Sequence, residues 1–150
     1  MICVRRPALL LALATLAVAG CASHHVPEAA LQTAPAGIDW TTTPTVSVAL
    51  TDFDFTPDHP TFTSGKPIRL VLANNGSDRH DFSAPAFFAA ASYRAGSTLP
   101  ADGKVVVKKD QKAEIDLVPG PAGNYPLECT EFLHALFGMT GTITVTGSAN

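Results

Sequence analysis

Apolar and polar residues alternate along much of the chain from Val46 onward, which is the pattern of β-strands that bury one face. The alternation is clearest at Val46, Val48 and Leu50, at Ile68, Leu70 and Leu72, and at Ile115 and Leu117. Clusters of Gly, Pro, Asn and Asp separate these stretches at residues 64–67, 74–78, 101–104 and 119–124. Several short strands joined by such turns predict an all-β protein, either a sandwich or a barrel.

One stretch lacks this alternation. The segment PAFFAAASY, residues 85–93, is rich in alanine, which is a strong helix former. It predicts a short helix that crosses one end of the sandwich. No internal repeat is visible in the sequence.

The last two expected strands lie on either side of a loop. In NYPLEC, Tyr125 and Leu127 share one face with Cys129, which is therefore predicted to point inward at the end of its strand. After the loop, GTITVTG places Ile143 and Val145 on one face. We expect the thiol at the edge of the sandwich, directly before the connecting loop.

The length and composition fit one globular domain with an appendage. The chain has 150 residues, of which 46% are hydrophobic and 15% charged, and this is typical of neither a disordered nor a membrane-embedded protein. The formal net charge is −3. No basic surface of the kind that neutralises phosphates is indicated, so nucleic acid is not expected as a partner.

The N-terminus has the features of a targeting segment. Arg5 and Arg6 precede an apolar run, Ala8–Ala19, that is too short to span a bilayer as a stable helix. The run ends in VAGC, which resembles the bacterial lipobox and implies that Cys21 takes a diacylglycerol. We expect residues 1–20 to be a lipoprotein signal peptide. An ordinary signal peptide that happens to end near a cysteine is the alternative.

Residues 21–43 are expected to connect the lipidated cysteine to the domain. The segment is rich in Ala, Thr and Pro without sustained periodicity, which is typical of a flexible linker. His24 and His25 within it are expected to be incidental, with weak copper binding as the alternative. The domain itself is expected to span residues 44–150.

The cysteine count follows from this processing. Cleavage after residue 20 removes Cys3, and lipid occupies Cys21, so Cys129 is left as a lone thiol and no disulfide forms within the mature chain. A lone thiol in an oxidising compartment is expected to be buried, reactive or metal-bound. The mature chain keeps 8 basic residues against 13 acidic ones, a net charge of −5.

Cys129 begins a row of metal-binding side chains at regular spacing, Cys129-x4-His134-x4-Met139. A second imidazole, His80, is available upstream in SDRHDFSAP. Two imidazoles, a thiolate and a thioether suit a blue copper site, which has three strong donors and a weak axial sulfur, whereas zinc usually takes more Cys or His and no thioether. His59, in TPDHP, matches no ligand position and is expected to be a turn residue.

Residues from about 44 to 147 resemble a cupredoxin of the plastocyanin and azurin type. The resemblance is carried by FDFTP after the first strand, SGKPIRLVLANNGSDRHDF around the upstream His, PGPAGNYPLEC before the Cys, and HALFGMTGTITV at the end of the domain. It implies a Greek-key β-sandwich that transfers single electrons. It also implies one type 1 copper ion, bound through His80, Cys129 and His134 with Met139 axial.

Two positions depart from the family pattern. In that pattern the residues after the upstream His and after the Cys tie their loops together, and these are Asp81 and Thr130 here, although Asn is common at the first position. A carboxylate there lowers the redox potential, or is protonated, or is turned outward, and the sequence leaves these alternatives open. Leu133 stands where many members carry Gly before the loop His.

Four large apolar residues surround the loop His: Phe132, Leu133, Leu136 and Phe137. The resemblance implies that electrons leave through this His within an apolar docking patch. Closure of the core by the same side chains is the alternative, and we expect about half of them to point outward.

The resemblance predicts an electron carrier rather than an enzyme, and the chain lacks the paired His-x-His motifs of multicopper oxidases. We expect a monomer that is lipid-anchored in the bacterial cell envelope, faces the periplasm and meets redox proteins at the His134 loop. One alternative is copper buffering or delivery, with His24 and His25 as the entry point. Another is a copper-free interaction module. The absence of a Met-rich motif favours the carrier.

Overall fold

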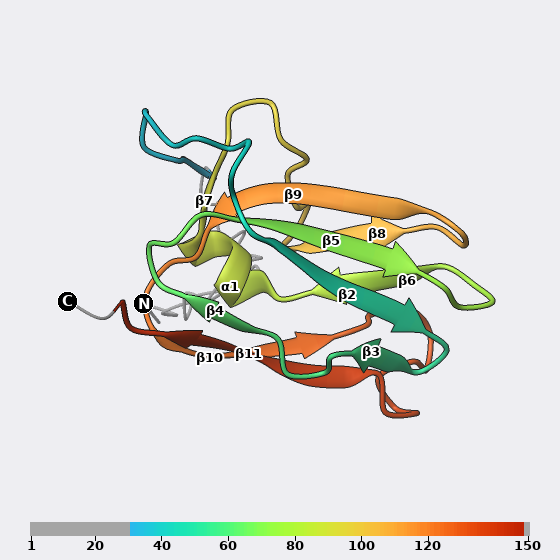
Figure 1. Ribbon diagram of the computed structural model, residues 1–150. Helices are drawn as coiled ribbons and strands as arrows, with labels where there is room; N and C mark the ends of the chain where they lie inside the picture. Colours follow the sequence, from blue (N-terminus) through green and yellow to red (C-terminus); the bar gives the residue numbers. More distant parts are fainter. Residues whose placement is uncertain (1–30, 149–150) are drawn as a thin grey trace, which may run out of the picture.

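Two β-sheets pack face to face in the computed structural model, which describes residues 31–148 (Figure 1). This confirms the predicted all-β sandwich with one short helix. The expected signal peptide, Cys21, His24 and His25 lie outside the described residues. Within residues 31–148, no helix has the length and apolar character needed to cross a membrane.

The first sheet has six strands in the order β1-β7-β9-β5-β2-β3. Their bounds are β1 Gln32–Thr33, β7 Ser92–Tyr93, β9 Lys112–Val118, β5 Ile68–Asn74, β2 Thr45–Thr51 and β3 Asp54–Thr56. Strands β2 and β5 run parallel, whereas β5 and β9 run antiparallel. A parallel pair needs a crossover connection, and here the chain passes through the second sheet between β2 and β5.

The second sheet has five strands in the order β4-β11-β10-β6-β8. Their bounds are β4 Thr61–Thr63, β11 Thr140–Thr146, β10 Gly123–Glu128, β6 His80–Ser83 and β8 Lys104–Val107. Strand β10 is antiparallel to both of its neighbours, β11 and β6.

The predicted helix is present but shorter than expected. Helix α1 covers Pro85–Ala90 and buries Phe87 and Phe88, and its proline lies at the start, where a missing N–H leaves no helical hydrogen bond unmade. The last residues of the expected helix form β7 instead. Tyr93 is buried there, and its hydroxyl donates to the carbonyl of Phe88 at 2.7 Å. Tertiary contacts therefore override the helical preference of the alanines.

The alternating apolar residues fill the space between the sheets. In β5, Ile68, Leu70 and Leu72 are buried and the residues between them are only partly covered, as the period of two predicts. The other predicted apolar residues are also buried, apart from Val46, near the start of β2, and Tyr125, in β10, which are partly buried. Phe82 links the two sheets by edge-on contacts, with its ring centre 5.8 Å from that of Phe55.

Part of the expected linker belongs to the first sheet. Strand β1 pairs in parallel with β7, and the N–H of Ala34 donates to the carbonyl of Tyr93 at 2.8 Å. The folded part therefore begins before residue 44, because the open edge of β7 offers backbone groups that this segment satisfies. A strand of two residues has no periodic pattern, so β1 could not be predicted from the sequence.

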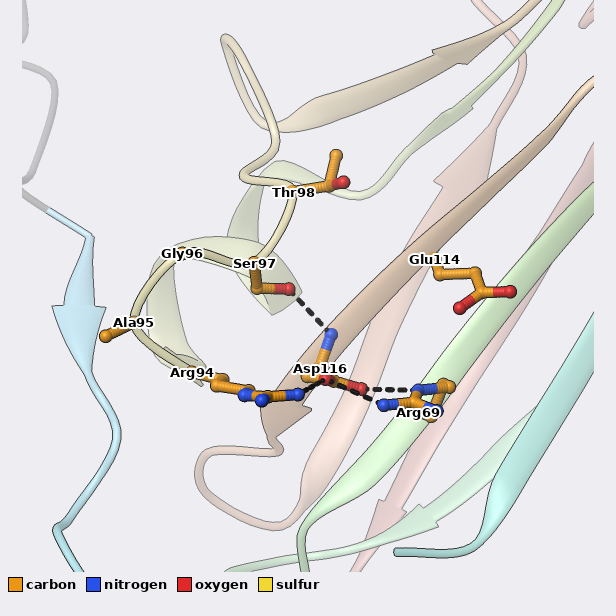
Figure 2. Close-up of a pocket in the computed structure, with 8 residues that line it drawn as sticks. All are labelled: Arg69, Arg94, Ala95, Gly96, Ser97, Thr98, Glu114 and Asp116. Atoms are coloured by element: carbon orange, nitrogen blue, oxygen red, sulfur yellow. Dashed lines mark hydrogen bonds and ion pairs between the residues drawn. The ribbon is translucent and has the colours of Figure 1, made fainter. Parts of the chain in front are cut away.

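An ion-pair cluster on the outer face of the first sheet ties a loop to it (Figure 2). The carboxylate of Asp116 accepts from Arg69 Nε at 2.8 Å and Nη2 at 3.1 Å, and from Arg94 Nη1 at 3.0 Å. The backbone N–H of Asp116 donates to the hydroxyl of Ser97 at 2.9 Å. Hydrogen bonding from Arg69, followed by that from Arg94, holds the pKa of Asp116 below its usual value.

The Asp116→Asn variant is expected to lose about 1 kcal/mol of unfolding free energy at pH 7, because it keeps the shape but not the charge that both arginines pair with. Since the folded-state pKa is depressed, this stabilisation is present above the unfolded pKa of about 3.9 and is lost as the pH falls through the folded-state pKa. Urea unfolding at a series of pH values should show the two proteins converging in acid. Glu114→Gln, on the same strand, is the control. A pH-independent difference would contradict the assignment.

Candidate metal centre

The four candidate ligands come from one end of the second sheet. His80 begins β6, Cys129 follows the end of β10, and Met139 precedes β11, with His134 in the loop between the last two. Because β10 is antiparallel to β6 and β11, the start of β6, the end of β10 and the start of β11 meet at one end of the sandwich (Figure 1).

Three donor atoms converge there. His80 Nδ1 and His134 Nδ1 are 3.1 Å apart, and Cys129 Sγ lies 4.0 Å from the first and 3.4 Å from the second. His80 and Cys129 are fully buried, whereas His134 is partly exposed. Among residues 31–148, no other group of three or more His, Cys, Asp or Glu side chains is gathered closely enough to hold a metal ion.

Backbone hydrogen bonds fix the loop that carries the other ligands. The N–H of Cys129 donates to the carbonyl of Met139 at 3.0 Å, and the N–H of Met139 donates to the carbonyl of His134 at 3.0 Å. Met139 is fully buried, so its side chain is held on the inner side of this loop. Leu133 has a φ of 65°, in the region that favours glycine. This backbone conformation explains why many cupredoxins carry glycine at the position that Leu133 occupies here.

Asn74 shapes the turn that delivers His80. Its buried amide nitrogen donates to the carbonyls of Asp78 at 2.8 Å and Val107 at 2.9 Å, and its oxygen accepts from the N–H of Gly76 at 2.9 Å. The turn is thereby anchored to β8. The imidazole of His80 consequently enters the site from a rigid support.

Asp81 and Thr130 join the two loops beneath the surface. The carboxylate of Asp81 accepts from the N–H of Thr130 at 2.9 Å and from its hydroxyl at 2.6 Å. Lys104 Nζ lies 3.5 Å from the same carboxylate and donates to the Thr130 hydroxyl oxygen at 2.7 Å. Asp81 is fully buried, so its side chain is not turned outward. Its own N–H donates to Cys129 Sγ at 3.4 Å.

A second link joins the same loops at the surface. Arg79 donates through Nε and Nη2 to the two carboxylate oxygens of Glu131, each at 2.7 Å. This bidentate pair lowers the pKa of Glu131. Arg79 precedes His80 in the chain, and Glu131 lies two residues after Cys129. The pair therefore restrains both ligands from the outside, and the sequence analysis did not identify it.

Apolar side chains surround His134 at the surface. Phe132 is 85% exposed, Leu136 77%, Phe137 61% and Leu133 42%. The expectation that about half would point outward was wrong, since all four do. Inside the loop, the buried residues are instead the ligands His80, Cys129 and Met139.

The turn between β2 and β3 supplies two further residues that the sequence did not single out. The ring of Phe53 meets that of His134 edge-on, with centres 5.3 Å apart, and that of Phe137 at 5.2 Å. Asp52 Oδ1 lies 3.3 Å from His80 Nε2. Both contacts cross from the first sheet to the second. His59 is away from the cluster and pairs with Asp58 at 2.8 Å.

The donor set fits copper. Burial raises the pKa of the Cys129 thiol, an effect opposed by the N–H groups of Asp81 and Glu131. A bound cation deprotonates a coordinating thiol outright. His80, Cys129 and His134 would supply three strong donors to the ion and Met139 a weak fourth one, which is the ligand set of a blue copper site.

Solved structures share the fold of this chain. The chain is similar to auracyanin B, at 19% identity and a TM-score of 0.54 over 73% of this chain and 93% of that one. It is also similar to auracyanin from the photosynthetic bacterium Roseiflexus castenholzii, at 18% identity and a TM-score of 0.52, covering 69% of this chain and 98% of that one. A multicopper oxidase from Campylobacter jejuni matches at 9% identity and a TM-score of 0.55, but only over 32% of its length and 77% of this chain. At these identities the likeness concerns the fold.

The domain is a two-sheet sandwich with a His-Cys-His cluster and a nearby Met. These features support a type 1 copper site. The Cupredoxin-like domain family matches residues 9–145 of the sequence, and the chain belongs to this family. None of the curated proteins is similar enough to count as a relative.

Proposed function

We propose that this protein is a type 1 copper electron carrier, anchored to the bacterial membrane through lipid on Cys21 and facing the periplasm. The observation that carries the proposal is the asymmetric burial of the site. His80, Cys129 and Met139 are fully enclosed, whereas His134 reaches the surface in the middle of exposed apolar side chains. An enclosed site with one accessible edge suits electron exchange better than metal delivery, which needs accessible ligands.

The protein's own groups prepare the site. Backbone bonds and the Asp81–Thr130 link hold the donors in place, so that little rearrangement accompanies a change of redox state. Copper, when bound, supplies the one-electron couple. The Asp81 N–H donates to the Cys129 sulfur and thereby favours its anionic form. His80, Cys129 and Met139 have no exposed surface, so water does not reach these three ligands.

The exposed apolar residues around His134 suit a protein partner. Large contiguous apolar surfaces on soluble domains usually mark contact sites. We propose that redox proteins dock on Phe132, Leu136 and Phe137. Docking there would bring the partner's redox centre close to His134. The anchor on Cys21 would confine this encounter to the membrane surface. The molecular mass of the protein extracted from bacterial membranes is compared with that of the Cys21→Ser variant. This comparison tests whether Cys21 carries lipid.

A visible absorption spectrum tests the copper site directly. The purified protein is loaded with Cu(II), desalted and scanned before and after a mild reductant and reoxidation. An intense thiolate-to-copper band that bleaches and returns is expected. Stoichiometric copper without the band would instead favour copper buffering or delivery. Absence of both would leave only a copper-free sandwich.

Met139→Leu is expected to keep the intense band and raise the redox potential. The substitution conserves volume in a fully buried position, so a stability loss under about 1.5 kcal/mol is expected. Only the weak axial sulfur is removed, and its loss withdraws a donor from the Cu(II) state. Spectroelectrochemical titration measures the shift. An unchanged potential would place Met139 outside the coordination sphere.

A further inference from the structure

The nitrogen of His80 that faces away from the ligand cluster meets a carboxylate. His80 Nδ1 lies toward His134 and Cys129, and Nε2 lies 3.3 Å from Asp52 Oδ1. His80 has no exposed surface, whereas the Asp52 side chain is 44% exposed. The imidazole is therefore held between the metal-binding cluster and an acidic group at the rim of the sandwich.

The surrounding turn positions this carboxylate. Asp52 Oδ1 accepts from the N–H of Ser77 at 2.8 Å as well as facing His80. The Ser77 bond and the His80 contact share this one oxygen, so the turn holds the carboxylate facing the ring.

Gly76 leaves the space in which the two groups meet. A Cβ on Gly76 would lie 2.5 Å from His80 Nε2 and 2.7 Å from Asp52 Oδ1. Gly76 is not among the described residues with positive φ, so its backbone does not require glycine. The three atoms nearest to such a Cβ all belong to His80 or Asp52, so a side chain there would displace the Asp52–His80 contact.

We infer that Asp52 is a positioning residue for the copper site: it accepts the Nε2–H of His80 and so fixes the tautomer that presents the Nδ1 lone pair to the metal. This inference rests on the proposed copper site. A ligating His commonly donates its other N–H to a carboxylate, which fixes its orientation and raises its basicity. Here Asp52 occupies that place, from a different sheet and 28 residues upstream of the ligand.

Four variants of the full-length protein test the inference. Asp52→Ala removes the acceptor, and Asp52→Asn keeps an oxygen at the same place but removes its charge. Gly76→Ala leaves Asp52 intact and disturbs the contact through its Cβ. Asp54→Ala is the matched control, because this nearby exposed carboxylate bonds to Thr56 instead of His80.

The first readout uses copper-free protein, so it does not depend on the proposed function. Long-range ¹H–¹⁵N correlation of the His rings should show His80 as a single Nε2–H tautomer in the wild type, Asp52→Asn and Asp54→Ala. A tautomer mixture is expected in Asp52→Ala and Gly76→Ala. The inference is overturned if these two variants keep the wild-type pattern, even if their melting temperatures fall through loss of the Ser77 bond.

The second readout is copper binding. Competition titration should show Cu(II) affinity reduced by about 10- to 100-fold in Asp52→Ala and Gly76→Ala, by less in Asp52→Asn, and unchanged in Asp54→Ala. The redox potential should rise in the order of these losses, since a less basic imidazole supports Cu(II) less well. Equal affinity in Asp52→Ala and Asp54→Ala overturns the inference. A wild type that lacks the visible band contradicts the proposed function instead, and the tautomer result still stands.

Discussion

Replacing Cys129 with serine is expected to abolish the intense visible absorption of the copper-loaded protein. The sulfur lies 3.4 Å from His134 Nδ1 and 4.0 Å from His80 Nδ1, so it would be the anionic donor of the cluster once copper is bound. A serine hydroxyl is neither readily ionised nor a soft ligand, whereas Cu(I) and blue copper centres depend on thiolate. Cu(II) affinity is expected to fall by more than about 100-fold, beyond the loss typical of an outer-shell partner.

The control for this variant is His59→Ala. His59 is an exposed imidazole that pairs with Asp58 and lies outside the cluster, so its removal should leave the spectrum unchanged. The comparison separates loss of a ligand from a general loss of copper-binding side chains. If Cys129→Ser kept an intense band, the assignment of the thiolate would be wrong.

Replacing Asp81 with alanine is expected to lower the unfolding free energy by about 3 kcal/mol, because the change leaves buried donors without an acceptor. The N–H and hydroxyl of Thr130 both donate to Asp81, and Lys104 lies beside it. A loss of this size corresponds to roughly 10 °C in melting temperature. Thermal unfolding of the copper-free protein measures it without interference from the metal.

Asp81→Asn is the matched variant and separates structure from charge. Its amide oxygen can still accept from the N–H of Thr130, so most of the stability should return. The negative charge near Cys129 is lost, however, and this charge favours Cu(II) over Cu(I). The redox potential is therefore expected to rise. A melting temperature for Asp81→Ala within about 2 °C of the wild type would show that the link is dispensable.

Much of the architecture was predictable because it depends on local patterns. A period of two identified the strands that became β2, β5 and β9, since one face of each is buried against the other sheet. Turn residues separated them correctly. The short β1 and the early end of α1 could not be predicted in this way. Strand β1 depends on pairing with β7, and α1 ends early because the residues that follow it form β7.

The candidate site was accessible from the sequence for a chemical reason. Thiol, thioether and imidazole groups are scarce in this chain, so their spacing around Cys129, His134 and Met139 carried information. The exposure of the surrounding apolar residues did not follow from the sequence. It depends on how the loop packs on the rest of the domain, and in the structure His80, Cys129 and Met139 are buried whereas the four apolar residues are exposed.

The sequence by itself determined the sandwich class, the inward direction of Cys129 and the residue types that can bind copper, since these follow from periodicity and side-chain chemistry. Only the tertiary structure decided which groups surround the ligands. Asp52 approaches His80, and Phe53 packs on His134, although the members of each pair are far apart in the chain and Asp52 and Phe53 belong to a turn of the first sheet. Such contacts depend on how the two sheets stack on each other, and the packing of the whole core sets that arrangement.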